Sequence, residues 1–192
     1  MNIGIQGGKG SFNEEACAHF IDDLHISDVQ TVYCYTTENV LKQLMARTID
    51  RGVFAIYNST SRLVDETADV LGHYSYDVIT YATVPVRHCL MTLSDREIAD
   101  VETIMGHPEA IFQCKETLAK RYSDIITKSG TGDQIDSAAI AALLAKGELS
   151  SDIAVLGSRM IAQAYGLDVI AEGLQDDPKN TTTFLFVKKY IP

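Results

Sequence analysis

Positive charge is scarce in this chain. Its 192 residues contain 16 Lys and Arg against 26 Asp and Glu, which gives a formal net charge of −10. The basic residues form no dense cluster along the sequence. Because nucleic-acid binding depends on a basic face that neutralises phosphates, we expect no nucleic-acid partner. A small anionic ligand remains compatible with this charge if backbone amides and a few local cations supply positive potential.

Closely spaced cysteines and long apolar runs are also missing. The four cysteines (Cys17, Cys34, Cys89 and Cys114) are far apart and form no C-x-x-C pair, which argues against a zinc site and a disulfide scaffold. We expect reduced, mostly buried thiols in a cytoplasmic protein. No apolar run approaches the roughly 20 residues of a membrane span, so no membrane partner is expected. Residues 1–5 lack the pattern of a signal peptide and are predicted to form a strand.

The chain is instead rich in short apolar runs that end in polar or glycine-containing turns. Several of these turns precede segments with helical patterns, as at 37–45, 63–71, 136–146 and 158–165. This alternation is typical of βαβ units, in which ligands gather at the carboxyl ends of the strands. A crossing near 80–85 and a return near 166–175 predict two α/β lobes with a cleft between them. We expect a first lobe of residues 1–80 plus 167–192 and a second of 81–166.

Two turns carry candidate site residues. The segment G-G-K-G-S-F at 7–12 lies between a strand and a helix, and free N–H groups at such a helix start bind carboxylate or phosphate. It matches neither the nucleotide P-loop nor the dinucleotide fingerprint, and a tight turn without a ligand is the alternative. The segment N-S-T-S-R at 58–62 follows the strand at 53–57 and is expected to open a helix.

Hydroxyl side chains begin the final predicted strand, N-T-T-T-F-L-F-V at 180–187. Side chains of a strand alternate between its faces, so Thr182 and Phe184 share one face and Thr183 lies on the other. A β-favouring threonine run is the alternative interpretation. Elsewhere, Pro108 predicts the start of a helix with Phe112 on its apolar side, and residues 129–134 are predicted to form a flexible loop.

Seven segments, in order over nearly the whole chain, resemble motifs of the prephenate dehydratase catalytic domain. They are G-S-F-N-E-E-A at 10–16, N-S-T at 58–60, P-V-R-H-C-L at 85–90, H-P-E-A followed by Q-C at 107–114, D-S-A at 136–138, Y-G-L at 165–167 and N-T-T-T-F at 180–184. The resemblance implies an α/β fold of two lobes, like periplasmic binding proteins of type II, with the active site in the interlobe cleft. The regulatory ACT domain that often follows in this family is not in this sequence, so feedback by phenylalanine through it is not expected.

The resemblance also implies the chemistry and the residues that carry it. Prephenate would lose CO2 and water to give phenylpyruvate, without a metal or a cofactor. Thr182 would donate to the departing hydroxyl. The implied substrate-binding residues are Ser11 (through nearby amides), Asn58, Ser59, Gln113, Ser137 and Phe184. His107 is interpreted as structural. The expected partner is a small dicarboxylate substrate, and a homodimer or homotetramer is expected.

Three positions depart from the family pattern. Tyr57 replaces the glutamate of E-N-S-T, Thr183 replaces the arginine of T-R-F, and Gly106 stands where serine is common. The first two changes remove one charge of each sign, so we interpret them as a paired loss. Arg62 is a candidate substitute cation in substrate binding, and Lys9 is a second.

Other functions of the same fold stay open. The chain could take arogenate in place of prephenate, or act as a non-aromatising prephenate decarboxylase. It could also be a non-catalytic protein that binds a small anion. Retention of Thr182 favours dehydration. The changes at Tyr57 and Thr183 favour the decarboxylase, and the missing arginine at position 183 favours the binding protein.

Overall fold

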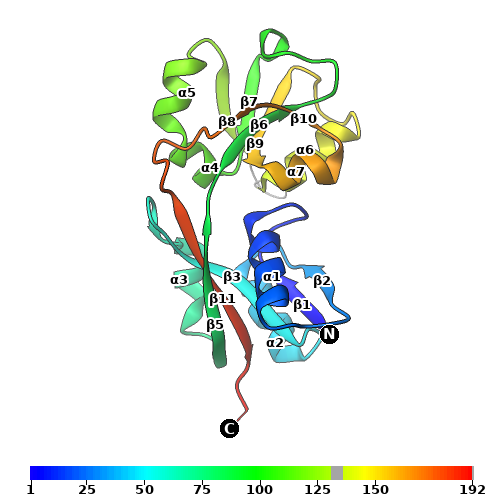
Figure 1. Ribbon diagram of the computed structural model, residues 1–192, viewed down its shortest axis with the longest axis vertical. Coiled ribbons are helices and arrows are strands. Elements are labelled where there is room, and N and C mark those ends of the chain that lie inside the picture. The colour runs from blue at the N-terminus through cyan, green and yellow to red at the C-terminus, as the bar shows by residue number, and fades with distance from the viewer. Residues whose placement is uncertain (131–135, 192) are drawn as a thin grey trace. The chain divides into compact units, whose positions relative to one another are not determined.

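The computed structural model describes residues 1–130 and 136–191, which form two compact units (Figure 1). Unit 1 contains residues 1–8, 12–85 and the chain from 181 onward, and unit 2 contains residues 9–11 and 86–180. Each unit is built on its own mixed β-sheet. The expectation of two α/β lobes is therefore confirmed.

Unit 1 has a sheet in the order β2-β1-β3-β11-β5, with β4 paired to β3. Its elements are β1 (Asn2–Ile5), α1 (Phe12–Asp23), β2 (Gln30–Tyr33), α2 (Thr37–Ala46), β3 (Arg51–Asn58), β4 (Arg62–Leu63), α3 (Asp65–Leu71), β5 (Tyr76–Pro85) and β11 (Thr181–Lys189). β1 is parallel to β2 and β3, as expected of βαβ units. β11 lies between β3 and β5 and is antiparallel to both, so the end of the chain completes the first sheet.

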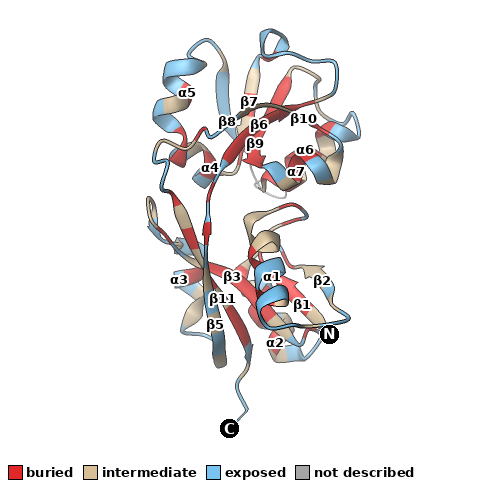
Figure 2. Ribbon diagram, viewed as in Figure 1, coloured by how far each residue is buried: buried red, intermediate tan, exposed pale blue. Residues whose placement is uncertain are grey.

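The sheet of unit 1 is covered on both faces. Phe20 of α1 stacks on Phe186 of β11, with ring centroids 5.2 Å apart. On the other face, residues of α2 pack with Phe54 and Val187. The hydroxyl of Thr36 caps α2 by accepting a hydrogen bond from the backbone of Asn39 at 3.1 Å. Figure 2 shows the resulting buried band along β3 and β11.

Unit 2 has a sheet in the order β10-β6-β9-β7-β8. Its elements are β6 (His88–Thr92), the 3-10 helix η1 (Ile98–Asp100), β7 (Thr103–Gly106), α4 (Pro108–Gln113), α5 (Lys115–Arg121), β8 (Ile126–Ser129), α6 (Ser137–Ala145), β9 (Ile153–Ser158), α7 (Arg159–Tyr165) and β10 (Asp168–Glu172). β7 is parallel to β8 and β9, whereas β6 is antiparallel to β9 and β10. Separate apolar clusters cover the two faces of this sheet.

Local signals mark several helix ends in unit 2. Pro108 begins α4, and Asp136 caps α6 by accepting from the backbone of Ala138. α7 ends at Gly166, whose φ of 67° is a left-handed conformation that glycine adopts without strain. The predicted burial of Phe112 is wrong, because its side chain is 54% exposed. The reason is that the helical segment breaks at Cys114 into α4 and α5, so one continuous apolar stripe does not form.

The boundaries of the units differ from those expected. β5 continues to Pro85 because it pairs with β11 along its whole length, so the crossing lies after 85 and not after 80. β10 pairs with β6 and therefore holds residues 168–172 in unit 2, which moves the return from 166 to 180. The predicted flexible loop at 129–134 lies mostly outside the described residues. Among those described, no helix is both long and apolar enough to cross a membrane.

Candidate active site

Thr182 is held at the start of β11 by a side chain from β3. It lies opposite Asn58 in the antiparallel ladder, and Asn58 Nδ2 donates a hydrogen bond of 2.9 Å to Thr182 Oγ1. Both residues are buried, with 2% of Asn58 and 8% of Thr182 exposed. Within the described chain, no atom accepts the hydroxyl hydrogen of Thr182. The hydroxyl thus receives one hydrogen bond and keeps its own proton to donate.

Backbone groups fix the orientation of the Asn58 amide. Its Oδ1 accepts from the N–H groups of Thr60 at 2.8 Å and Ser61 at 3.0 Å, while its Nδ2 also donates to the carbonyl of Thr181 at 3.1 Å. Rotating the amide by 180° would oppose donors to donors and an acceptor to an acceptor. Asn58 must therefore donate to Thr182, and its contacts make it a residue that positions this hydroxyl.

The turn at 58–62 does not open a helix, contrary to the prediction. After Asn58 the chain reverses, and Arg62 and Leu63 pair antiparallel with Asn58 and Tyr57. The turn is closed by the acceptor Asn58 Oδ1, and α3 begins only after this second strand. Ser59 is tied to β11 by two bonds, because its N–H donates to the carbonyl of Thr181 at 2.9 Å and its Oγ accepts from the Thr181 N–H at 3.0 Å.

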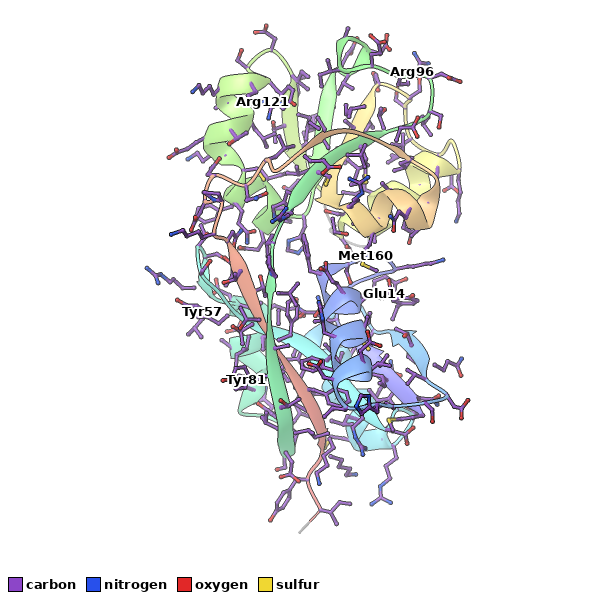
Figure 3. All side chains as sticks on the ribbon, viewed as in Figure 1. Glu14, Tyr57, Tyr81, Arg96, Arg121 and Met160 are labelled. Atoms are coloured by element: carbon purple, nitrogen blue, oxygen red, sulfur yellow. The ribbon has the colours of Figure 1, made fainter. Side chains whose placement is uncertain are left out.

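Tyr57 and Arg62 form an exposed pair beside the turn. Arg62 Nη1 donates to the hydroxyl of Tyr57 at 3.0 Å. Figure 3 shows Tyr57 beside the turn that leads to β4. Arg62 has a φ of 74°, which is uncommon for a residue with a side chain. The other candidate cation, Lys9, is exposed. Of the two candidate cations, Arg62 is the one that lies opposite Asn58 in the β3–β4 pair, and its guanidinium is held by the hydrogen bond to Tyr57.

The two replaced motif positions lie opposite each other. Thr183 pairs with Tyr57 in the β3–β11 ladder. A bulge follows immediately, because the next residue of β11, Phe184, pairs with Ala55. On its other side, Thr183 shares a hydrogen bond of 3.1 Å with Thr83 of β5. Side chains directly opposite in an antiparallel pair have Cβ atoms roughly 4.5–5.5 Å apart. A glutamate and an arginine at positions 57 and 183 would therefore be cross-strand neighbours.

Phe184 belongs to the core and not to the surface of a site. It shares the buried face of β11 with Thr182, as the alternation predicts, but only 1% of it is exposed. Its neighbours are Ile3, Ile5 and other apolar residues of the core of unit 1. The expectation that Phe184 shapes a pocket is therefore not supported, because its ring is enclosed by the sheet and α1.

The glycine-rich turn at residues 7–12 is held by close backbone packing. Gly7 and Gly10 have φ values of 83° and 85°. A Cβ at Gly10 would lie 2.7 Å from the backbone of Ile161, and the carbonyl of Gly10 accepts a hydrogen bond from the hydroxyl of Ser158. In the following residue, Ser11 Oγ is buried and has no hydrogen-bond partner among the described residues. A buried hydroxyl in this position is suited to meet a ligand group.

Gln113 is the centre of a buried amide and imidazole group in unit 2. Its Oε1 accepts from Asn180 Nδ2 at 2.8 Å and contacts His88 Nε2 at 2.9 Å. Because this amide oxygen only accepts, it places the imidazole proton on Nε2. The Nε2 of Gln113 makes no hydrogen bond to the described part of the chain, so it is available to a ligand. The sequence motifs contained His88 and Asn180, but nothing in them showed that both hold Gln113.

Burial keeps His88 neutral. Desolvation lowers its pKa from 6.5 to about 4, although the hydrogen bond with Gln113 acts in the opposite direction, and the charge of His107 lowers it further. His107 itself has the structural role expected of it. Its Nδ1 accepts from the backbone N–H of Glu109 at 3.2 Å and caps α4.

Ser137 uses its hydroxyl within the fold. It donates to the carbonyl of Leu156 at 2.7 Å and accepts from the N–H of His107 at 3.0 Å, with 5% of the residue exposed. Gly106 is close to the same carbonyl, since a Cβ there would lie 2.9 Å from the oxygen of Leu156. This close approach is a physical reason for glycine at that position.

The cysteines provide no nucleophile or metal site in this arrangement. All four are free and buried, as predicted. Burial raises the pKa of Cys34 and Cys89 to about 11, which disfavours their thiolates. The residues that the structure describes contain no group of three or more His, Cys, Asp or Glu placed to hold a metal ion.

The family model and the relatives of similar sequence point to one family. The family model "Prephenate dehydratase" matches residues 3–191. Arogenate dehydratase/prephenate dehydratase 2 of Arabidopsis thaliana is 27% identical over 190 residues, which cover 98% of this chain and 46% of that protein. The chain thus spans about half the length of this relative.

Solved structures show the same fold. Prephenate dehydratase from Arthrobacter aurescens, solved with L-Phe, superposes with a TM-score of 0.85 at 24% identity, covering 100% of this chain and 61% of that one. A periplasmic binding protein of Salmonella typhimurium superposes with a TM-score of 0.50 at 8% identity, covering 98% of this chain and 84% of that one. The expected fold class, α/β of the periplasmic-binding-protein type II kind, is confirmed. With the family model matched over almost every residue, the chain belongs to the prephenate dehydratase family.

Proposed function

We propose that this chain catalyses the decarboxylating dehydration of prephenate to phenylpyruvate, with Thr182 as the hydrogen-bond donor to the leaving hydroxyl. The observation that carries the proposal is the contact between Asn58 Nδ2 and Thr182 Oγ1. Because the Asn58 amide nitrogen can only donate, the threonine oxygen accepts, and the hydroxyl proton of Thr182 stays available to the substrate. A buried, pre-oriented donor aimed at developing negative charge is what this reaction requires.

The reaction needs little more than orientation and one proton. The carbon–carbon bond to the ring carboxylate breaks and releases CO2, and its electron pair enters the ring. The carbon–oxygen bond to the ring hydroxyl breaks with its own electron pair, and hydroxide leaves as water after taking up a proton. The ring becomes aromatic, and prephenate plus one proton give phenylpyruvate, CO2 and water. Threonine is a poor acid, so Thr182 acts by hydrogen bonding and by relaying a proton that comes ultimately from solvent.

Groups suited to the two carboxylates occur in both units. In unit 1, Arg62 is the pairing partner of Asn58 in the β3–β4 ladder and offers a guanidinium held by Tyr57. In unit 2, Gln113 offers an amide N–H fixed through its oxygen by Asn180 and His88. Ser11 adds a buried hydroxyl. We propose that Arg62, Gln113 and Ser11, with Ser59, bind the substrate, whereas Asn58 and Ser137 position other groups. The interlobe location of the active site remains a prediction from the resemblance.

Replacing Thr182 by valine tests the role of its hydroxyl. The substitution keeps the shape of the side chain and removes the donor, so kcat for phenylpyruvate formation should fall roughly 10²–10³-fold, as for other preorganised donors. Thr183→Val is the matched control, because it removes a hydroxyl from the opposite face of β11 and should change kcat less than threefold. A Thr182→Val protein as active as its parent would refute the proposed role.

Asn58→Asp tests the polarity of the contact. A carboxylate can still accept from Thr60 and Ser61, but it cannot donate to Thr182 and would instead accept the hydroxyl proton. We expect kcat to fall to the level of Thr182→Val, and Thr182→Val should have little further effect in the double variant. Circular dichroism and urea unfolding report whether the fold is kept. Full activity in a folded Asn58→Asp protein would contradict the positioning role.

The identity of the substrate follows from one comparative assay. The Arabidopsis thaliana relative carries both activities in its name, so arogenate is the second candidate substrate. Prephenate has a side-chain keto group where arogenate has an amino group. Measuring kcat/KM for each compound, with the aromatic product quantified, shows which of the two is the preferred substrate. A non-aromatic keto acid would identify a decarboxylase, and saturable binding without turnover would identify an anion-binding protein.

We also propose the cellular setting that the family resemblance suggests. The chain would contribute to phenylalanine biosynthesis as a cytoplasmic homodimer or homotetramer. Free, buried cysteines support a reducing compartment. Light scattering coupled to size-exclusion chromatography measures the oligomeric state, and a monomer at micromolar concentration would contradict it.

A further inference from the structure

Four basic residues are among those that line one hollow of unit 1. The hollow is lined by Leu44, Arg47, Ile49, Asp50, Arg51, Lys188, Lys189 and Ile191. These residues come from the end of α2, the start of β3 and the end of β11. A quarter of the 16 basic residues of a chain with net charge −10 therefore gather at one place. Like charges repel, so basic residues that share one hollow favour the binding of an anion there.

The hollow lies at the opposite end of β11 from Thr182. Lys188 follows Thr182 by six positions, which corresponds to about 20 Å of extended strand. Two of its lining residues, Leu44 and Ile49, are apolar and buried, whereas the basic residues are more exposed. The hollow therefore has an apolar floor and a cationic rim, and it is separate from the proposed active site.

The contacts within the rim leave most of its donors available. Lys189 Nζ donates to the carbonyl of Met45 at 2.7 Å, and Arg51 Nη1 donates to the carbonyl of Asp50 at 2.7 Å. Neither contact neutralises the cation. Arg47 makes no side-chain hydrogen bond or ion pair with the described residues. Lys188 faces Asp77 at 3.8 Å across the edge of the sheet.

The charge count indicates the class of ligand. Four cations and Asp50 leave a net charge of +3 among the lining residues, and the pairing of Lys188 with Asp77 reduces it to about +2. Two guanidinium groups match the planar oxygens of carboxylate and phosphate groups. We propose that this hollow is a second ligand site, for a small anion that carries at least two negative charges.

Calorimetric titration with inorganic pyrophosphate, and separately with succinate, tests this site at constant ionic strength. We expect saturable binding of one anion per chain for at least one of the two probes, and the tighter one identifies the acid group that the site prefers. Arg47→Gln combined with Arg51→Gln should weaken binding at least tenfold. Lys120→Gln combined with Arg121→Gln, at the end of α5, is the matched control and should change binding less than twofold; Figure 3 labels Arg121.

Loss of folding would also weaken anion binding, so the test includes a variant that is expected to tighten it. Asp50 accepts a hydrogen bond from the N–H of Asn2 at 2.7 Å, and an asparagine oxygen can keep this bond. Asp50→Asn should therefore preserve the fold and tighten binding about three- to tenfold, whereas Asp23→Asn, at the end of α1, should not.

Three outcomes would overturn the proposal. They are heats no larger than those of sodium chloride, equal weakening in the Lys120/Arg121 control, or no tightening in Asp50→Asn. Thr182→Val must bind the probes normally, which separates failure of this site from failure of the proposed reaction.

Discussion

Restoring the two replaced motif charges together should reveal coupling between Tyr57 and Thr183. The two residues are directly opposite in the β3–β11 ladder. Thr183→Arg alone removes the hydrogen bond with Thr83, which contributes about 0.5–1.5 kcal/mol, and adds a cation near Arg62. Tyr57→Glu alone exchanges a phenol for a carboxylate within reach of Arg62, which already donates to Tyr57. We expect the first change to destabilise the chain and the second to be nearly neutral.

The double variant places a carboxylate between two guanidinium groups. Opposite charges across an antiparallel pair contribute roughly 0.2–1 kcal/mol. Position 183 is half-buried and Tyr57 is 36% exposed, so screening is incomplete and we expect about 0.5–1 kcal/mol. If the arginine also supports the proposed chemistry, kcat/KM of the double variant should rise about tenfold or more above the parent, which corresponds to a charged hydrogen bond of at least roughly 1.5 kcal/mol.

Urea unfolding of the parent, both single variants and the double variant closes the thermodynamic cycle. The coupling should shrink in 0.5 M sodium chloride, because exposed ion pairs are screened. Tyr57→Gln in place of Tyr57→Glu is the uncharged control and should show no coupling with Thr183→Arg. A coupling free energy below about 0.3 kcal/mol, which is the usual error of additivity, would refute the interpretation of a paired loss.

Two further predictions concern unit 2. Burial lowers the pKa of His88 from 6.5 to about 4. Between pH 6.5 and pH 4 the imidazole is therefore protonated in the unfolded chain but not in the folded chain. Folding stability that is present above pH 6.5 is lost as the pH falls through this range. Between pH 7 and pH 5 the loss from this group should be roughly 2 kcal/mol, and urea titrations of the parent and His88→Gln should differ by that pH-dependent amount; parallel curves would show that His88 does not titrate in this way. Gly106→Ser should destabilise the chain by about 1–3 kcal/mol through contact with the Leu156 carbonyl, whereas Gly72→Ser, with nothing within 4 Å of a new Cβ, should have little effect on the urea midpoint.

Local interactions explain what could be predicted from the sequence. Thr36 and Asp136 cap the starts of α2 and α6, and Gly166 caps the end of α7. Each acts through contacts with residues a few positions away, so these roles follow from the order of residues alone. The alternation that buries Thr182 and Phe184 on one face of β11 is likewise a property of any strand. The family motifs added the two-lobed fold and the candidate hydroxyl at position 182.

Long-range pairing explains what could not be predicted. Helical periodicity cannot show that the chain reverses after Asn58, and so the role of Asn58 as the donor to Thr182 depended on the register between β3 and β11. The same pairing decided that Phe184 is enclosed by the core of unit 1. Sequence spacing also gave no reason for His88 and Asn180 to meet at Gln113, because these residues come from three separate segments.

The distribution of positive charge shows the difference most clearly. The amino-acid sequence by itself determined the net charge of −10, the strand and helix periods and the motifs of the family. Only the tertiary structure brought Arg47, Arg51, Lys188 and Lys189 together, although more than 130 positions separate the two arginines from the two lysines along the chain. The physical reason is that composition and periodicity are local properties, whereas a site is made by strand pairing and packing between residues that are remote in sequence.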